Sequence, residues 1–159
     1  MKWLLSFVIF LSLSCKPETK ASINLEVHDF EGIAPYLELE NSKTYVVNFW
    51  ATWCAPCVKE LPHFEALQAK YKDSVEVILV SLDFPHQYET KLKPFIKKHQ
   101  LKSKIIVLDD PDMNSWIPKV NPQWDGAIPV TLIYNASKRL FYNRTFTYEE
   151  LETELKTFL

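Results

Sequence analysis

Two cysteines separated by two residues give the strongest chemical signal in this sequence. Cys54 and Cys57 stand in NFWATWCAPCVKELP, residues Asn48–Pro62, between a strand-like run and a helix-like run. A disulfide that closes so short a loop removes little entropy from the unfolded chain, because the stabilisation grows with loop length. We therefore interpret the pair as a reactive centre rather than a structural cross-link.

Cys54 is predicted to lie where a strand gives way to a helix. Unpaired backbone N–H groups and the positive end of the helix dipole meet there and favour a thiolate over a thiol. Because the thiolate is the species that attacks a disulfide, we expect Cys54 to attack and Cys57, one turn later and facing the core, to resolve the mixed disulfide. Pro56 suits the first helical turn, where its missing N–H is not needed.

Alternating strands and helices are predicted around the cysteines. A helix beginning at Ala55 is indicated by apolar residues that recur every three or four positions: Cys57, Leu61, Phe64, Leu67 and Tyr71. Strands are predicted at 23–27, 36–39, 45–51, 75–82, 104–108, 130–134 and 139–144. Further helices are predicted at 88–100 and 148–158, with one turn at 114–117. This order predicts one α/β domain with a mixed central sheet and helices on both faces.

The first residues, MKWLLSFVIFLSLSC, are typical of an export signal, with one lysine before a short apolar run. The segment resembles a bacterial lipoprotein signal, although Ser12 stands where that pattern prefers leucine. We predict a signal at 1–14, lipidation of Cys15, a polar tether at 15–22 and a folded domain at 23–159. An ordinary signal peptide or an uncleaved anchor is the alternative.

Composition excludes several classes of function. The chain has 159 residues and a net charge of −2, which offers no electrostatic footprint for nucleic acid. Gly32 and Gly126 are its only glycines, so a glycine-rich phosphate loop is absent.

The motif FWATWCAPC and the later run GAIPVTLIYN resemble the thioredoxin superfamily and, within it, the TlpA/ResA-like extracytoplasmic thiol–disulfide oxidoreductases. The resemblance covers residues 27–159. It implies a three-layer sandwich with extra N-terminal strands and an inserted segment. It also implies a cis bond between Ile128 and Pro129, lying against the sulfurs and leaving the Ile128 backbone free to pair with an extended substrate. The substrate-binding residues expected on this basis are Trp53, Pro56, Trp124, Ile128 and Pro129.

Two positions are compared with that family. Thioredoxins keep a buried aspartate six residues before the first cysteine, where this chain has Asn48. The ResA-like branch has a glutamate three residues after the second cysteine, and Glu60 matches it. We expect Glu60 to act catalytically by handling the proton of Cys57, with a pKa raised by partial burial. The alternative is an acidic residue that only stabilises a first helical turn.

The resemblance implies a reductant of disulfides in exported proteins, for example apocytochrome c before haem attachment. Its expected electron donor is a membrane-embedded thiol reductase. The expected location is the periplasm or cell envelope, with a lipid on Cys15 holding a monomer to a membrane. No cofactor beyond the redox-active pair Cys54–Cys57 and no metal is expected.

Three alternatives remain at this stage. A zinc site would need further ligands, whereas the histidines are scattered singly. A copper metallochaperone would use the two thiolates, with His86 as the one plausible additional ligand. A peroxiredoxin-like peroxidase would use Cys54 with Thr52 upstream of it.

Overall fold

A single six-stranded sheet organises the protein. The computed structural model describes residues 23–159, so the predicted signal, tether and Cys15 lipidation site lie outside the described residues. The strands are β1 (Glu26–His28), β2 (Thr44–Trp50), β3 (Val75–Ser81), β4 (Lys104–Leu108), β5 (Val130–Tyr134) and β6 (Arg139–Tyr142). Their order is β1-β4-β3-β2-β5-β6. The first four in this order run parallel, β5 is antiparallel to β2, and β6 is antiparallel to β5.

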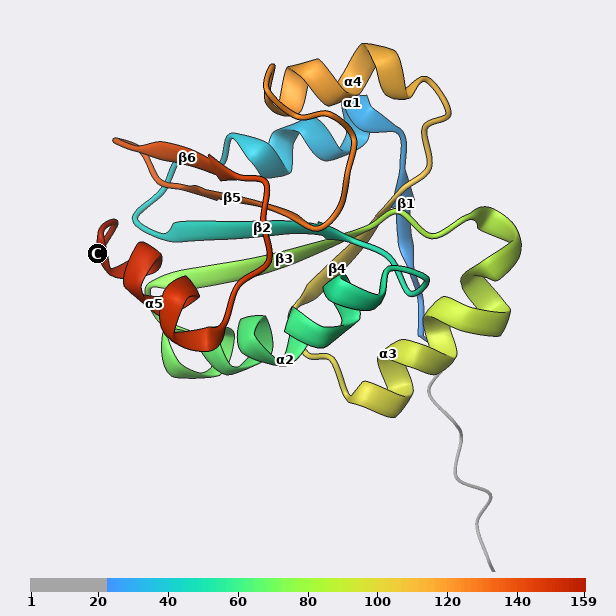
Figure 1. Ribbon diagram of the computed structural model, residues 1–159, viewed down its shortest axis with the longest axis horizontal. Helices are drawn as coiled ribbons and strands as arrows, with labels where there is room; N and C mark the ends of the chain where they lie inside the picture. Colours follow the sequence, from blue (N-terminus) through green and yellow to red (C-terminus); the bar gives the residue numbers. More distant parts are fainter. Residues whose placement is uncertain (1–22) are drawn as a thin grey trace, which may run out of the picture.

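Helices cover both faces of this sheet (Figure 1). On one face lie α1 (Phe30–Ile33) and α4 (Met113–Val120), and on the other lie α2 (Ala55–Lys70), α3 (Lys93–His99) and α5 (Tyr148–Lys156). Shorter helical segments are η1 (Ala34–Leu37), η2 (Pro85–Gln87) and η3 (Tyr88–Leu92). The predicted three-layer α/β sandwich is confirmed.

Strand β2 shows how the sequence builds the two cores. All seven of its residues are buried, as expected for a parallel strand covered on both faces. Because side chains alternate along a strand, Val46 and Trp50 join the core beneath α2, while Val47 and Phe49 join the core beneath α4. Asn48 shares its face with Val46 and Trp50 and therefore points toward α2.

Most predicted elements are present, including the last helix with its capping box between Thr147 and Glu150. The strand predicted at 36–39 is wrong. Asp29 caps α1 through the Gly32 N–H, and Pro35 opens η1, so this region folds into successive helical turns instead. Only β1 precedes β2 in the described chain, so the extra N-terminal strands are reduced to one.

Two helices differ from the prediction in extent. The turn predicted at 114–117 is the longer helix α4, because Trp116 and Val120, four residues apart, both reach the core. The helix predicted at 88–100 is divided into η3 and α3, with Pro94 in the first turn of α3. A proline there removes one backbone donor at the junction, where the Lys93 N–H donates to the Tyr88 carbonyl five residues back.

Candidate active site

Cys54 and Cys57 are joined in a disulfide at the start of α2, with their Cα atoms 5.2 Å apart. Cys54 is the N-cap residue, and the backbone N–H of Cys57 donates to its Sγ at 3.3 Å. Cys54 is 5% exposed, whereas Cys57 is 0% exposed. An incoming sulfur therefore has access to Cys54 alone, and the helix N–H groups are in place to stabilise a thiolate on it.

The loop before β5 forms the other side of the disulfide. The Ile128–Pro129 peptide bond is cis, as the resemblance implied. The carbonyl oxygen of Ile128 lies 3.7 Å from Cys54 Sγ, which brings residues 74 positions apart into contact. Pro129 is buried behind this carbonyl, while Pro56 is exposed on the first turn of α2. An extended chain that pairs with Ile128 would thus pass directly over the reactive sulfur.

Glu60 is buried on α2, one helical turn after Cys57. Its Oε1 accepts from the Asn48 side-chain amide at 3.0 Å, and its Oε2 accepts from the backbone N–H of Phe146 at 2.9 Å. Burial raises the pKa of Glu60 to about 7, and the two donors only partly oppose this effect. A carboxyl group poised near neutrality can both take and release a proton, which is the property that the sequence predicted.

Asn48 connects Glu60 to the sheet. Its amide nitrogen also lies 3.1 Å from the Thr131 hydroxyl and 3.4 Å from the Val130 carbonyl. These contacts join β2, β5 and α2 beneath the disulfide. The residue that replaces the thioredoxin aspartate therefore does not titrate but holds the nearby carboxyl group.

A second buried carboxylate was missed by the sequence reasoning. Asp83 accepts from the backbone N–H of Thr52 at 3.1 Å, from the Thr52 hydroxyl and from the Ser81 hydroxyl at 2.9 Å. It thereby fixes the turn that leads into Cys54. The available signal was its place directly after the predicted strand 75–82, at the carboxyl edge of the sheet.

The predicted aromatic contacts divide into one that is placed as expected and one that is not. Trp53 is 52% exposed beside Cys54 and stacks on the equally exposed Phe84, with ring centroids 6.0 Å apart. Trp124, expected as a wall of the substrate groove, is buried instead. Its indole N–H donates to the Ala127 carbonyl at 2.7 Å, and its ring packs against Phe49. Trp124 thus supports the loop before Pro129 from the core.

A groove of about 400 Å³ opens next to the disulfide. We call it the active-site groove and define it by its lining residues: Trp53, Leu82, Asp83, Phe84, Pro85, Leu108, Asp109, Asp110, Pro111, Met113, Trp116, Gly126 and Ile128. It lies where β3 and β4 end, which is where open α/β sheets commonly bind ligands.

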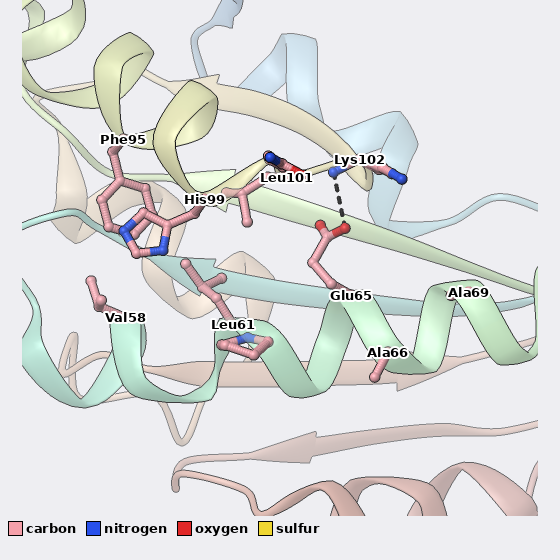
Figure 2. A pocket seen from close by; sticks show the side chains of 11 residues that line it. Val58, Leu61, Glu65, Ala66, Ala69, Phe95, His99, Leu101 and Lys102 are labelled. Carbon is pink, nitrogen blue, oxygen red and sulfur yellow. Dashed lines mark hydrogen bonds between the residues drawn. The ribbon is translucent and has the colours of Figure 1, made fainter.

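A separate cavity of about 390 Å³ lies between α2 and the segment that follows α3. Figure 2 shows Phe95 and His99 at one end of it and Glu65 near the other. Glu65 accepts from the backbone N–H groups of Lys102 and Ser103 and so ties this segment to α2. No sulfur-containing residue lines this cavity, and its one carboxylate, Glu65, already accepts two backbone hydrogen bonds. The cavity is therefore not the redox centre.

The structure places the residues on which the zinc, copper and peroxidase alternatives would depend. Among residues 23–159, no group of three or more histidine, cysteine or acidic side chains is arranged to hold a metal ion. His86 stacks on Phe84, with ring centroids 5.8 Å apart. The Thr52 hydroxyl, which a peroxidase would turn toward Cys54, donates to Asp83.

No helix in the described part of the chain has the length and apolar character needed to cross a bilayer.

A mixed sheet between helical layers, with a Cys-x-x-Cys pair at a helix N-terminus and a cis-proline against it, defines a protein of the thioredoxin-like class. The chain belongs to the AhpC/TSA family, whose model matches residues 21–142.

Curated relatives match part of this chain. The thiol-disulfide oxidoreductase ResA of Bacillus cereus is 37% identical over 89 residues, which cover 55% of this chain and 50% of that protein. ResA of Oceanobacillus iheyensis is 52% identical over 42 residues, covering 26% of this chain and 22% of its own. The chain thus spans about half the length, or less, of these relatives.

Solved structures agree in fold. StoA from Bacillus subtilis superposes with a TM-score of 0.55 at 24% identity, covering 72% of this chain and 83% of its own. A DsbF homologue from Corynebacterium diphtheriae gives a TM-score of 0.61 at 19% identity, covering 79% and 75%. At these identities the likeness establishes the thioredoxin-like fold.

Proposed function

We propose that this protein is an extracytoplasmic thiol–disulfide oxidoreductase that reduces disulfides in exported proteins. The observation that carries the proposal is the Cys54–Cys57 disulfide at the N-terminus of α2, with the Ile128 carbonyl 3.7 Å from Cys54 Sγ. Relatives that are named thiol-disulfide oxidoreductases, and that match part of this chain, support the same activity. The cysteine pair carries the electrons with no further cofactor, in a monomer.

The reaction runs in two exchanges. The Cys54 thiolate attacks one sulfur of the substrate disulfide, forms a mixed disulfide and expels the other substrate sulfur as a thiolate. Cys57 then loses its proton and attacks Cys54 Sγ, which releases the second substrate sulfur. The substrate gains two electrons, its two released thiolates take up protons from the solvent, and the protein ends as the Cys54–Cys57 disulfide.

Glu60 takes the proton that Cys57 releases in the second exchange. A pKa of about 7 makes the carboxylate available from neutral pH upward. Resolution of the mixed disulfide should therefore accelerate as pH rises through about 7. Glu60→Gln should remove this rise and slow resolution by about a hundredfold or more above neutrality, measured by stopped-flow release of a fluorescent substrate thiol. An unchanged pH profile would remove Glu60 from the mechanism.

The activity is tested by reduction of insulin or a synthetic disulfide peptide with Cys54→Ser and Cys57→Ser as a pair. Cys54→Ser should abolish turnover, because the attacking sulfur is gone. Cys57→Ser should accumulate a mixed disulfide on Cys54, visible by mass spectrometry. If wild type and Cys54→Ser behave alike, the protein is not a dithiol oxidoreductase.

We place the domain at the periplasm or cell envelope, anchored through lipid on Cys15, and supplied with electrons by a membrane-embedded thiol reductase. Oxidised apocytochrome c is one candidate substrate. A reduction potential more reducing than that of glutathione would support the reductant role, and a far more oxidising one would reverse the direction of electron flow. Incorporation of labelled fatty acid into wild type but not into Cys15→Ala tests the anchor.

A further inference from the structure

The active-site groove lies next to the reactive disulfide. Ile128 lines the groove, and its carbonyl oxygen lies 3.7 Å from Cys54 Sγ. Trp53, which also lines the groove, directly precedes Cys54. A polypeptide paired with the Ile128 backbone would therefore carry side chains along the mouth of the groove.

The groove has an unusually apolar lining for an open surface. Trp53, Phe84 and Met113 belong to the small set of large apolar side chains that are exposed in the described part of the chain, and all three line this groove. The rings of Trp53 and Phe84 are stacked within 16° of parallel. Buried Trp116 and Leu108 contribute further apolar lining. Such a concentration of exposed apolar surface marks a place where a partner is bound.

Charge at the groove has one sign. Asp83, Asp109 and Asp110 line it, and no lysine or arginine is among its lining residues. Asp110 accepts from backbone N–H groups, whereas Asp109 is exposed at the end of β4. The negative field is also felt by Tyr88, whose pKa is raised to about 12 by burial first and then by Asp109 and Asp83.

We propose that the active-site groove selects extended oxidised polypeptides in which an aromatic or long aliphatic side chain near the disulfide cysteine is followed by lysine or arginine. The apolar side chain would lie against Trp53, Phe84 and Met113, and the cation would face Asp109. Side chains two residues apart in an extended chain share a face, so the apolar residue belongs two positions from the cysteine. This inference rests on the proposed function and names the substrate class of the same site.

Four matched peptides test the preference with the reduced full chain in detergent. Each carries one cysteine in a mixed disulfide with nitrothiobenzoate, phenylalanine or serine two residues away on both sides, and lysine or glutamate four residues away on both sides, so that all three side chains share one face of the extended peptide. Cys54 attacks the peptide sulfur and expels the coloured nitrothiobenzoate thiolate, and Cys57 then releases the peptide thiol. The phenylalanine–lysine peptide should exceed the serine–glutamate peptide by about tenfold or more in the second-order rate constant for release of nitrothiobenzoate in a single turnover, equivalent to about 1.4 kcal/mol.

Variants assign the preference to the groove. Met113→Ser should reduce the advantage of phenylalanine over serine. Asp109→Asn should reduce the advantage of lysine over glutamate by about threefold, and added salt should do the same in wild type. Asp73→Asn removes the same charge from an exposed turn before β3, at the opposite end of the sheet, and should leave the lysine preference intact.

A small disulfide, hydroxyethyl disulfide, separates the two possible failures. Equal rates with all four peptides, or a preference for glutamate, overturn the selectivity while reduction of the small disulfide keeps the proposed activity standing. Failure to reduce the small disulfide and every peptide overturns the activity itself and the selectivity with it.

Discussion

Two buried carboxyl groups lie near the disulfide, and both residues are only 2% exposed. Glu60 is three residues after Cys57 on α2, and Asp83 is hydrogen-bonded to Thr52, two residues before Cys54. Glu60 lies beneath the pair on α2 and receives one donor from Asn48 and one from Phe146. Asp83 lies beside the pair after β3 and receives donors from Thr52 and Ser81. Equal burial thus accompanies two different hydrogen-bond environments.

The difference between the two groups indicates a division of work. The donors around Glu60 come from distant elements and do not overcome the cost of burying its charge, so its pKa lies near 7. The donors around Asp83 come from the turn before Cys54 and from the end of β3. Glu60 is therefore suited to exchanging protons, while Asp83 is suited to fixing the geometry of the attacking residue.

The largest expected effect is the pH dependence of stability caused by Glu60. Its pKa rises from an ordinary value of 4.5 to about 7, so between these pH values the folded protein holds a proton that the unfolded chain has lost. Stability should accordingly fall as pH rises through this window, by at most about 3 kcal/mol. Urea unfolding of the oxidised protein at several pH values measures this loss.

Glu60→Gln should flatten that dependence, since the amide does not titrate. Glu149→Gln removes a carboxyl group from the exposed first turn of α5 and serves as the control. If Glu60→Gln retained the full slope between pH 4.5 and 7, another group would have to account for it.

A somewhat smaller effect is expected for Asp83→Asn. The new amide group would direct hydrogens at the Thr52 and Ser81 donors, leaving some of them buried without an acceptor. This should cost about 2 to 3 kcal/mol in urea unfolding at neutral pH, and it should also slow attack by Cys54. Asp73→Asn supplies the matched surface change. Wild-type stability in Asp83→Asn would show that the fixed turn does not depend on this carboxylate.

The smallest effect in this comparison is expected for Asn48→Ala. Loss of one donor to the Glu60 carboxylate should raise its pKa further, by about one pH unit or about 1.4 kcal/mol. Carbon-detected NMR titration of the Glu60 carboxyl group measures this directly. Thr131→Val removes a partner of Asn48 without touching Glu60, and should move the titration less. Equal shifts in both variants would argue against a direct role for the amide.

Local features of the sequence were sufficient for much of the fold and for the central cysteines. The period-three and period-four pattern of α2 and the capping box at Thr147 are determined by neighbouring residues, and both were predicted. The buried run of β2 was likewise visible. Such patterns report on a segment's own periodicity and need no knowledge of what packs against it.

Features that depend on distant partners were harder to predict. The residues next to Trp124 in the sequence do not show whether its ring faces a substrate or packs on Phe49. The packing of α4 and β2 determines that the ring lies against Phe49. The contact between Glu60 and Asn48 follows from the alternation of β2 combined with the docking of α2. The role of Asp83 could be predicted only if the loop after β3 were known to lie beside the loop after β2.

Because Cys57 is completely buried, it fixes the order in which disulfide bonds can be exchanged. In the proposed reaction, a molecule that brings electrons and a molecule that takes them would each have to form a bond with Cys54 first. The two would therefore compete for the same sulfur atom and would have to react in turn.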